Sequence, residues 1–145
     1  ATPATFRALV QAGWQGGDIA ALCGGESFPV SLVDDLKAAC KRGVWNVYGP
    51  TETTIWSTSR SLHDMESSLL ASSRLVPIGR PLRGTRISLS QIAAEVESEV
   101  QETFARDGPM GELLIGGAGV SCGYHNRPEL TAARFRRCLD SSSGK

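Results

Sequence analysis

The apolar residues of this 145-residue chain fall into short runs that glycine, proline and polar residues interrupt. Residues 19–23 and 44–48 have the length and composition of buried strands, and the pairs Gly24-Gly25 and Gly49-Pro50 end them. Between these runs, apolar residues recur at helical spacing, namely Leu32, Val33 and Leu36. Alternating strands and helices up to about residue 60 predict an α/β fold with a parallel layer.

A helix is predicted at the start of the chain. Thr2 can cap it, Pro3 fits its first turn, and Gly13 can end it. Three apolar residues would share one face of this helix: Phe6, Leu9 and Val10. We therefore interpret that face as part of the core.

The second half of the chain is predicted to be rich in strands. Residues 56–62, 86–89 and 112–115 have strand patterns. Pro128 can begin a helix, because proline fits the first helical turn. We interpret this half as the start of a β-barrel-like subdomain.

Residues 91–107 carry apolar side chains at every fourth position, which predicts a one-sided helix. The apolar positions are Ile92, Val96, Val100 and Phe104. The glutamates between them are typical of a solvated face, and a metal-binding acidic cluster is the weaker interpretation. The segment is interpreted as a helical insertion, and three explanations stay open: a lineage-specific excursion, a partner surface or an error in the gene sequence.

Charge and cysteine content exclude several classes of function. Fifteen basic and fifteen acidic residues cancel, so no overall field favours nucleic acid or an anionic membrane. No apolar run approaches the roughly 18 residues of a membrane helix. The cysteines form no Cys-x-x-Cys pair and lie far from both histidines; they are Cys23, Cys40, Cys122 and Cys138. We expect free thiols in a reducing compartment, and hence a cytoplasmic protein. From the charge balance and the short apolar runs we expect neither nucleic acid nor a membrane as partner.

Polar and aromatic residues gather in residues 46–57. Just past the bend at Gly49-Pro50, threonine hydroxyls and exposed N–H groups can hold phosphate oxygens, and Glu52 can hold Mg²⁺. Tyr48 offers a flat face for a base. The Gly24-Gly25 turn likewise permits close approach of a ligand. The residues alone leave two interpretations open at both places: a nucleotide site, or a strand that ends in a plain turn.

Three stretches of the chain resemble motifs of adenylate-forming ligases, and in particular of nonribosomal peptide synthetase adenylation domains. Residues 48–54, Tyr-Gly-Pro-Thr-Glu-Thr-Thr, resemble the core motif, and residues 1–14 and 111–131 resemble the segments before and after it. The order is right, and the resemblance runs over almost the whole chain of residues 1–145. It fails at residues 91–107, where adenylation domains usually carry a compact hairpin. It implies a partial adenylation domain, which is a fragment of the ligases' large N-terminal domain: a parallel α/β layer followed by the start of a β-barrel-like subdomain.

The resemblance implies ATP-dependent activation of an amino acid as an aminoacyl-adenylate. The adenylate would then pass to phosphopantetheine on a carrier domain, with carrier and condensation domains of the same megasynthetase as partners. Thr51 and Glu52 would be the catalytic residues, Thr51 at the α-phosphate and Glu52 on Mg²⁺. The nucleotide contacts it implies are Gly25, Glu26, Asn46, Tyr48, Gly49 and Thr51. The glycine-rich residues 111–123 would serve as scaffold beside the site.

The family's pocket positions, carried over by their offsets from the motifs, are Leu22, Gly24, Val47, Ile55 and Trp56. A charged substrate side chain would find no partner among these residues. Trp56 is bulky and would leave little room. The set resembles the glycine-activating pocket, whereas a cysteine-activating pocket usually has serine where Gly24 stands. A small amino acid, glycine first, is the expected substrate.

Several motifs of the family do not occur in residues 1–145. They are the phosphate loop with its lysine, the Tyr-Arg-Thr-Gly-Asp ribose motif and the C-terminal domain with the catalytic lysine. We therefore expect the isolated fragment to be inactive. Two alternatives stay open: a fragment of a ligase that loads fatty or aryl acids onto coenzyme A, and a non-catalytic remnant that serves as an interaction module.

Overall fold

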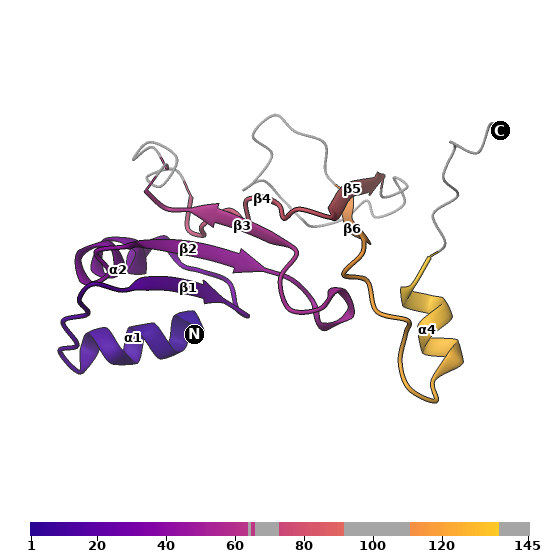
Figure 1. The fold of residues 1–145 in the computed structure, drawn as a ribbon, viewed down its shortest axis with the longest axis horizontal. Helices are drawn as coiled ribbons and strands as arrows, with labels where there is room; N and C mark the ends of the chain where they lie inside the picture. Colours follow the sequence, from indigo (N-terminus) through magenta and orange to yellow (C-terminus); the bar gives the residue numbers. More distant parts are fainter. Residues whose placement is uncertain (64, 66–72, 92–110, 137–145) are drawn as a thin grey trace, which may run out of the picture.

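The fold is described from a computed structural model, which covers residues 1–63, 65, 73–91 and 111–136. Four strands form a mixed sheet in the order β1-β2-β3-β4 (Figure 1). β1 (Ala20–Gly24) runs parallel to β2 (Gly43–Tyr48). β3 (Thr58–Ser61) is antiparallel to β2, and β4 (Arg80–Pro81) is antiparallel to β3. The α/β class is confirmed, but among the described strands only the β1–β2 pair is parallel; β3 is antiparallel because the chain reverses immediately after β2.

Two helices cover one face of this sheet. In α1 (Pro3–Gln11), Thr2 caps the first turn by accepting a hydrogen bond from the N–H of Thr5 at 3.3 Å. Gly13, with φ of 81°, ends the helix as predicted. A 3₁₀ turn, η1 (Val30–Leu32), leads into α2 (Val33–Ala39).

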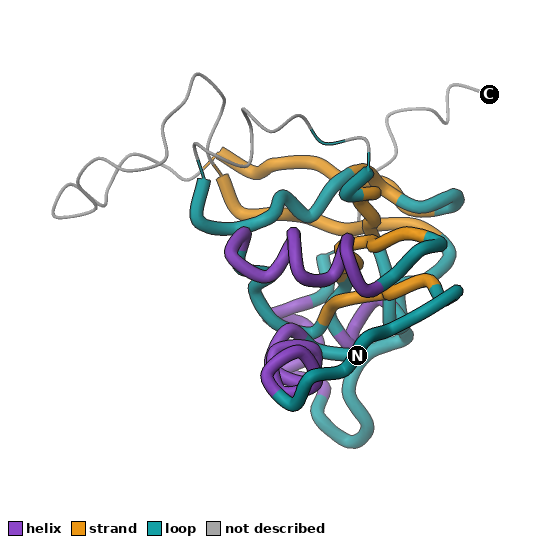
Figure 2. Tube along the Cα trace, turned by 90° about the vertical axis from the view of Figure 1, so that its left-hand side faces the viewer, coloured by secondary structure: helices purple, strands orange, loops and turns teal. Residues whose placement is uncertain are grey.

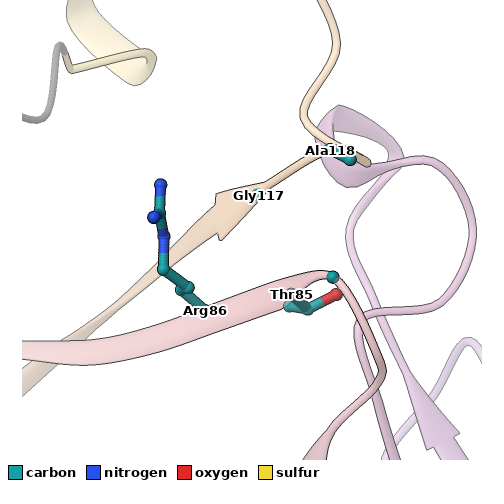
Figure 3. A pocket seen from close by; sticks show the side chains of 5 residues that line it. Thr85, Arg86, Gly117 and Ala118 are labelled. Atoms are coloured by element: carbon teal, nitrogen blue, oxygen red, sulfur yellow. The ribbon is translucent and has the colours of Figure 1, made fainter.

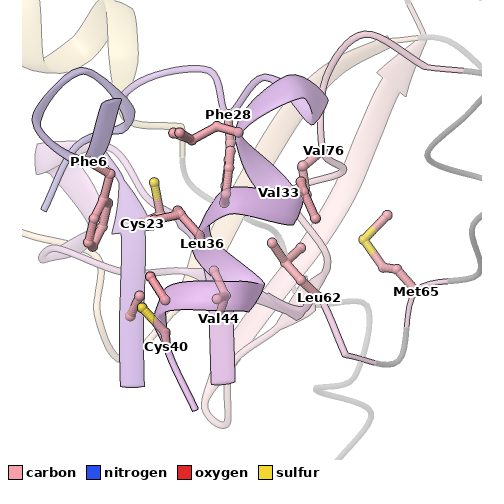
Figure 4. Close-up of a cluster of buried hydrophobic side chains, with 13 residues drawn as sticks. Phe6, Cys23, Phe28, Val33, Leu36, Cys40, Val44, Leu62, Met65 and Val76 are labelled. Atoms are coloured by element: carbon pink, nitrogen blue, oxygen red, sulfur yellow. The ribbon is translucent and has the colours of Figure 1, made fainter. Parts of the chain in front are cut away.

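Figure 2 shows the helices and strands from the side, and Figure 4 shows the buried side chains that form the core between these helices and the sheet. Its largest fully buried apolar side chains are Phe28, Leu36, Leu62, Val33 and Val44. The apolar face predicted for α1 is only partly used. Phe6 is buried and Val10 packs against the core, but Leu9 is 37% exposed.

A second sheet contains two antiparallel strands, β5 (Thr85–Gln91) and β6 (Gly111–Gly117). A short helix, α4 (Pro128–Arg134), follows β6 and contains no buried residue. Figure 1 shows this half lying beyond the end of the first sheet, away from α1 and α2. The strands predicted around residues 86–89 and 112–115 and the helix at Pro128 are confirmed.

The predicted helical insertion of residues 91–107 falls almost wholly outside the described residues. Gln91 itself is the last residue of β5 and pairs with Gly111. The chain therefore leaves the sheet at the end of β5 and returns to it at the start of β6, at paired positions. The helix assigned to residues 92–107 stays a prediction.

Candidate functional site

The chain bends sharply at the end of β2, where Gly49 and Pro50 lead into the 3₁₀ turn η2 (Thr51–Thr53). The N–H of Ser57 donates to the carbonyl of Tyr48 at 2.7 Å and closes the bend. A Cβ atom on Gly49 would lie 2.7 Å from that nitrogen, so the bend admits only glycine. The hydroxyls of Thr53 and Ser57 share a buried hydrogen bond of 2.6 Å, which fixes the base of the turn.

Two consecutive β-branched residues after η2 have left-handed backbones. Thr54 has φ of 59° and Ile55 has φ of 68°. This conformation is unfavourable for such residues by roughly 1–2 kcal/mol each. The Thr54 hydroxyl offsets part of this energy by donating to the carbonyl of Gly119 at 2.8 Å. Backbone strain of this kind persists where the surroundings over-determine it, often at functional sites.

The carboxylate of Glu52 is half-buried and accepts a short hydrogen bond at Oε1 from the Tyr124 hydroxyl. This bond, together with the Glu52 backbone N–H and the nearby Arg134 guanidinium, lowers the pKa of Glu52 despite partial desolvation. The same bond raises the pKa of Tyr124, which keeps its proton. Glu52 is thus an ionised carboxylate at neutral pH, with Tyr124 as its donor.

Residues 119–124, which follow β6, close over the η2 turn. The N–H of Ser121 donates to the Glu52 carbonyl at 2.8 Å. A Cβ atom on Gly119 would lie 2.9 Å from the carbonyl oxygen of Thr53, so glycine permits this approach. We call residues 119–124 the clasp. The expectation that this glycine-rich segment is scaffold therefore missed a direct contact with the predicted metal-binding carboxylate.

α4 holds the clasp in place through Thr131. The Thr131 hydroxyl accepts from the N–H of Tyr124 at 3.0 Å and donates to the Arg127 carbonyl at 2.9 Å. The Tyr124 ring also meets the Phe135 ring edge-on, with centroids 5.5 Å apart. The position of the Tyr124 side chain is thus fixed independently of Glu52.

The residues assigned to the substrate pocket lie partly together. Gly24 pairs with Val47 across β1 and β2, and a Cβ atom on Gly24 would lie 2.8 Å from the Trp56 ring. Leu22 lies two residues earlier on the same face of β1 and is half exposed. Ile55 is 65% exposed. The structure therefore gathers Gly24, Val47 and Trp56 at one point, with Leu22 and Ile55 more open to solvent.

The residues assigned to the nucleotide lie at one edge of the sheet. β1 and β2 are parallel, so their carboxyl ends are neighbours. Gly25 directly follows β1 and Tyr48 is the last residue of β2, so both lie at the end where open α/β sheets bind ligands. Gly25 has φ of 86° and is exposed. Exposed Glu26 accepts from the N–H of Ala4 at 3.4 Å. No described contact tests the nucleotide roles of these residues, which stay predictions.

Asn46 has a structural role that its sequence position did not reveal. Its side chain is buried, and Nδ2 donates to the carbonyls of Val76 at 3.2 Å and Pro77 at 2.9 Å. These bonds tie residues 76–77 to β2. The Asn46 amide nitrogen thus already has two acceptors. Its predicted contact with the adenine edge is not tested by these bonds and stays a prediction.

Two hollows lie away from the predicted site residues. One, of about 480 Å³, is lined at the open end of the β5–β6 sheet by Thr85, Arg86, Gly117, Ala118 and Gly84 (Figure 3). The other, of about 440 Å³, is lined by Ser59, Arg60, Ser61 and Arg80. Neither contains a residue that the sequence assigned to the nucleotide or the substrate.

Among the described residues, Glu52 is the one candidate metal ligand. No three histidine, cysteine or acidic side chains converge within the described part of the chain. Cys23, Cys40 and Cys122 are free thiols, and Cys138, for which the same was predicted, lies outside the described residues. An ionised carboxylate with one oxygen bonded to Tyr124 suits Mg²⁺, which takes one or two carboxylates together with substrate phosphates. Among the described helices, none has the length and apolar character needed to cross a membrane.

Comparison with known proteins agrees with this geometry. The sequence profile described as "AMP-binding enzyme" matches residues 1–125. The chain therefore belongs to the AMP-binding enzyme family, as part of an adenylation domain of an AMP-forming ligase. It is 39% identical over 137 residues to the PKS-NRPS hybrid synthetase acdB of Aspergillus candidus, covering 93% of this chain and 5% of that protein. It is 36% identical over 137 residues to a dimodular nonribosomal peptide synthase of Bacillus subtilis, with the same two shares.

Solved structures show the same fold. A four-domain nonribosomal peptide synthetase bound to AMP and glycine has 37% identity and a TM-score of 0.73, covering 96% of this chain and 9% of that one. The Vibrio cholerae adenylation domain AlmE has 26% identity and a TM-score of 0.68, covering 95% and 26%. The Klebsiella oxytoca NpsA N-terminal subdomain has 26% identity and a TM-score of 0.69, covering 94% and 32%. The fold is that of the N-terminal subdomain of adenylate-forming ligases, and the chain spans about 5% of the curated synthetases described above.

Proposed function

We propose that this chain forms part of the active site of an amino-acid adenylation domain in a nonribosomal peptide synthetase. The domain would use ATP and Mg²⁺ to activate the amino acid and would transfer it to phosphopantetheine on a carrier domain. The observation that carries the proposal is the ionised Glu52 carboxylate, held by Tyr124 at the carboxyl ends of β1 and β2. A carboxylate there can hold a divalent cation against nucleotide phosphates.

Each assigned residue has a task in this proposal. Glu52 holds the cation, which offsets charge on the phosphates, and Thr51 donates its hydroxyl to the α-phosphate. Tyr48 stacks on adenine, with Gly25 and Glu26 as the other wall of the slot and Gly49 and Asn46 beside it. Positioning of the substrate carboxylate against the α-phosphorus and neutralisation of charge on the phosphates would together accelerate the reaction.

The substrate we favour is a small amino acid, glycine first. Trp56 lies against Gly24, which pairs with Val47, so the proposed pocket would be apolar and narrowed by an indole ring. Two of the similar structures support this choice, since one is bound to AMP and glycine and the other to glycyl-adenosine-5'-phosphate. Carrier and condensation domains of the same synthetase are the proposed partners. The free thiols support a cytoplasmic location.

The test is amino-acid-dependent pyrophosphate exchange by the adenylation domain that contains this chain. We expect glycine to give the strongest signal and Glu52→Gln to reduce it by roughly 100-fold or more, as for loss of a charge-stabilising group. Residues 1–145 alone should give no signal. Exchange that depends on aryl or fatty acids but not on amino acids would assign the chain to an acyl or aryl ligase instead. A folded domain with no exchange for any acid would support a non-catalytic module.

A further inference from the structure

Tyr124 touches the proposed metal-binding residue from a distant part of the sequence. It lies 72 residues after Glu52 and donates its hydroxyl proton to Oε1 of that carboxylate. No other hydrogen bond of the Glu52 side chain to another residue is present in the described part of the chain. One carboxylate oxygen is thereby occupied, and among the described residues Tyr124 is the side chain that helps to orient the other oxygen.

We propose that Tyr124 is a positioning residue, whose hydroxyl holds the Glu52 carboxylate in the orientation that meets a nucleotide-bound divalent cation. The proposal rests on the proposed function, because it needs Glu52 to be the metal ligand. Partners that orient a metal-binding carboxylate affect metal affinity and activity almost as strongly as the ligands themselves.

The contacts around Tyr124 separate this role from a general structural one. The main chain of Glu52 is held by the N–H of Ser121, and the neighbouring Thr54 is held by the carbonyl of Gly119. On the other side, the Tyr124 N–H is bound to Thr131 and its ring packs on Phe135. None of these contacts uses the Tyr124 hydroxyl. Removal of the hydroxyl alone should therefore leave the clasp closed and free only the carboxylate.

The donor and acceptor of the Tyr124–Glu52 hydrogen bond also agree with the positioning role. A phenol can only donate to an ionised carboxylate, so Tyr124 binds Glu52 without competing with a cation for the second oxygen. Charge-assisted hydrogen bonds of this kind are roughly twice as strong as neutral ones.

The experiment uses the complete adenylation domain and three variants: Tyr124→Phe, Glu52→Gln and the control His125→Ala, which alters an exposed neighbour. Mn²⁺ binding in the presence of ATP is counted by electron paramagnetic resonance, and exchange kinetics and melting temperature are measured alongside. We expect Tyr124→Phe to weaken Mn²⁺ binding by about tenfold. It should lower kcat while KM for the amino acid and the melting temperature stay near the parent values, and high Mg²⁺ should partly restore exchange.

The outcomes separate the two proposals. Weakened Mn²⁺ binding in both Tyr124→Phe and Glu52→Gln supports the positioning role. Parent-like Mn²⁺ binding in Tyr124→Phe, with loss in Glu52→Gln, overturns the role of Tyr124 and leaves the proposed function standing. Parent-like binding in both variants overturns the metal role of Glu52 itself. A Tyr124→Phe domain that loses only thermal stability identifies the hydroxyl as structural and overturns the positioning role.

Discussion

The indole of Trp56 lies over the α-carbon of Gly24, so close that a Cβ atom there would be 2.8 Å from Cζ3. The same Cβ atom would press on the carbonyl oxygen of Val47 in the neighbouring strand. We therefore expect Gly24→Ala to reduce the free energy of unfolding by about 2 kcal/mol, as for an overpacked core position. Denaturant unfolding of the adenylation domain measures this loss.

Gly116→Ala is the matched control for this substitution. A Cβ atom on Gly116 would meet nothing within 4 Å, and Gly116 also lies in a strand. Its effect should stay within about 0.5 kcal/mol. Equal losses in the two variants would show that strand glycine in general, and not the contact with Trp56, sets the result.

Trp56 should decide how large an amino acid the domain accepts. Trp56→Ala removes the ring that lies against Gly24 and should open space beside this residue. We expect the ratio of kcat/KM for leucine to kcat/KM for glycine to rise by about tenfold or more, since each added methylene in an apolar pocket is worth 10-fold or above. Pyrophosphate exchange with both amino acids gives the ratio. A parent-like ratio would place the specificity pocket elsewhere.

The left-handed backbone at Ile55 indicates a strained conformation that is retained for function and lowers the stability of the domain. Ile55 is 65% exposed, so its side chain contributes little burial, while its φ of 68° is unfavourable for a β-branched residue. Asparagine tolerates this conformation. Ile55→Asn should therefore raise the free energy of unfolding by about 1 kcal/mol while lowering amino-acid activation. A destabilised Ile55→Asn domain would contradict the assignment of strain.

Asn46 should be required for stability. Asn46→Ala removes the two donors to the carbonyls of Val76 and Pro77 and leaves both carbonyls without that amide. We expect a loss of about 2 kcal/mol, at roughly 1 kcal/mol per hydrogen bond. Gln11→Ala, which removes an exposed amide at the end of α1, serves as control and should change little. An Asn46→Ala domain that keeps parent stability but has a raised KM for ATP would favour the adenine contact alone.

The cysteines should differ in reactivity with pH. Burial raises the pKa of Cys23 to about 11 and also raises that of Cys40, whereas Cys122 is exposed. Iodoacetamide at pH 8 should therefore modify Cys122 well before the two buried thiols, because the thiolate is the nucleophile. The stability due to Cys23 should be fully present below pH 9 and be lost as pH rises towards 11, since the unfolded thiol ionises first.

Mass spectrometry of the labelled peptides checks the order of modification. A Cys122→Ser domain provides the control, in which early labelling should disappear. Rapid labelling of Cys23 in the folded domain would contradict the burial that raises its pKa.

Local patterns were sufficient to predict most elements but few of the contacts between them. The strand at residues 44–48 was predictable because an apolar run ends at Gly49, and the helix after Thr2 because capping residues flank it. The antiparallel direction of β3 depends on the bend that Ser57 closes onto Tyr48, and periodicity carries no information about that.

Long-range partners were beyond sequence reasoning for the same reason. Asn46 finds its acceptors 30 and 31 residues away. Tyr124 reaches Glu52 across 72 residues, from a glycine-rich segment that had no local signal of a ligand contact. The resemblance to adenylate-forming ligases predicted the class and the central turn, but the motif that contains Tyr124 suggested scaffold alone.

The register of β5 and β6 has a practical consequence for protein engineering. Gln91 and Gly111 face each other as the last pair of an antiparallel ladder, so their α-carbons lie about 5 Å apart. A two-residue turn spans that gap without altering the register, and so do the ends of a foreign domain with adjacent termini. The pair Gln91–Gly111 is thus a natural splice point, at which residues 92–110 can be exchanged for a fluorescent reporter or a purification tag while the seven paired positions of the ribbon stay in place.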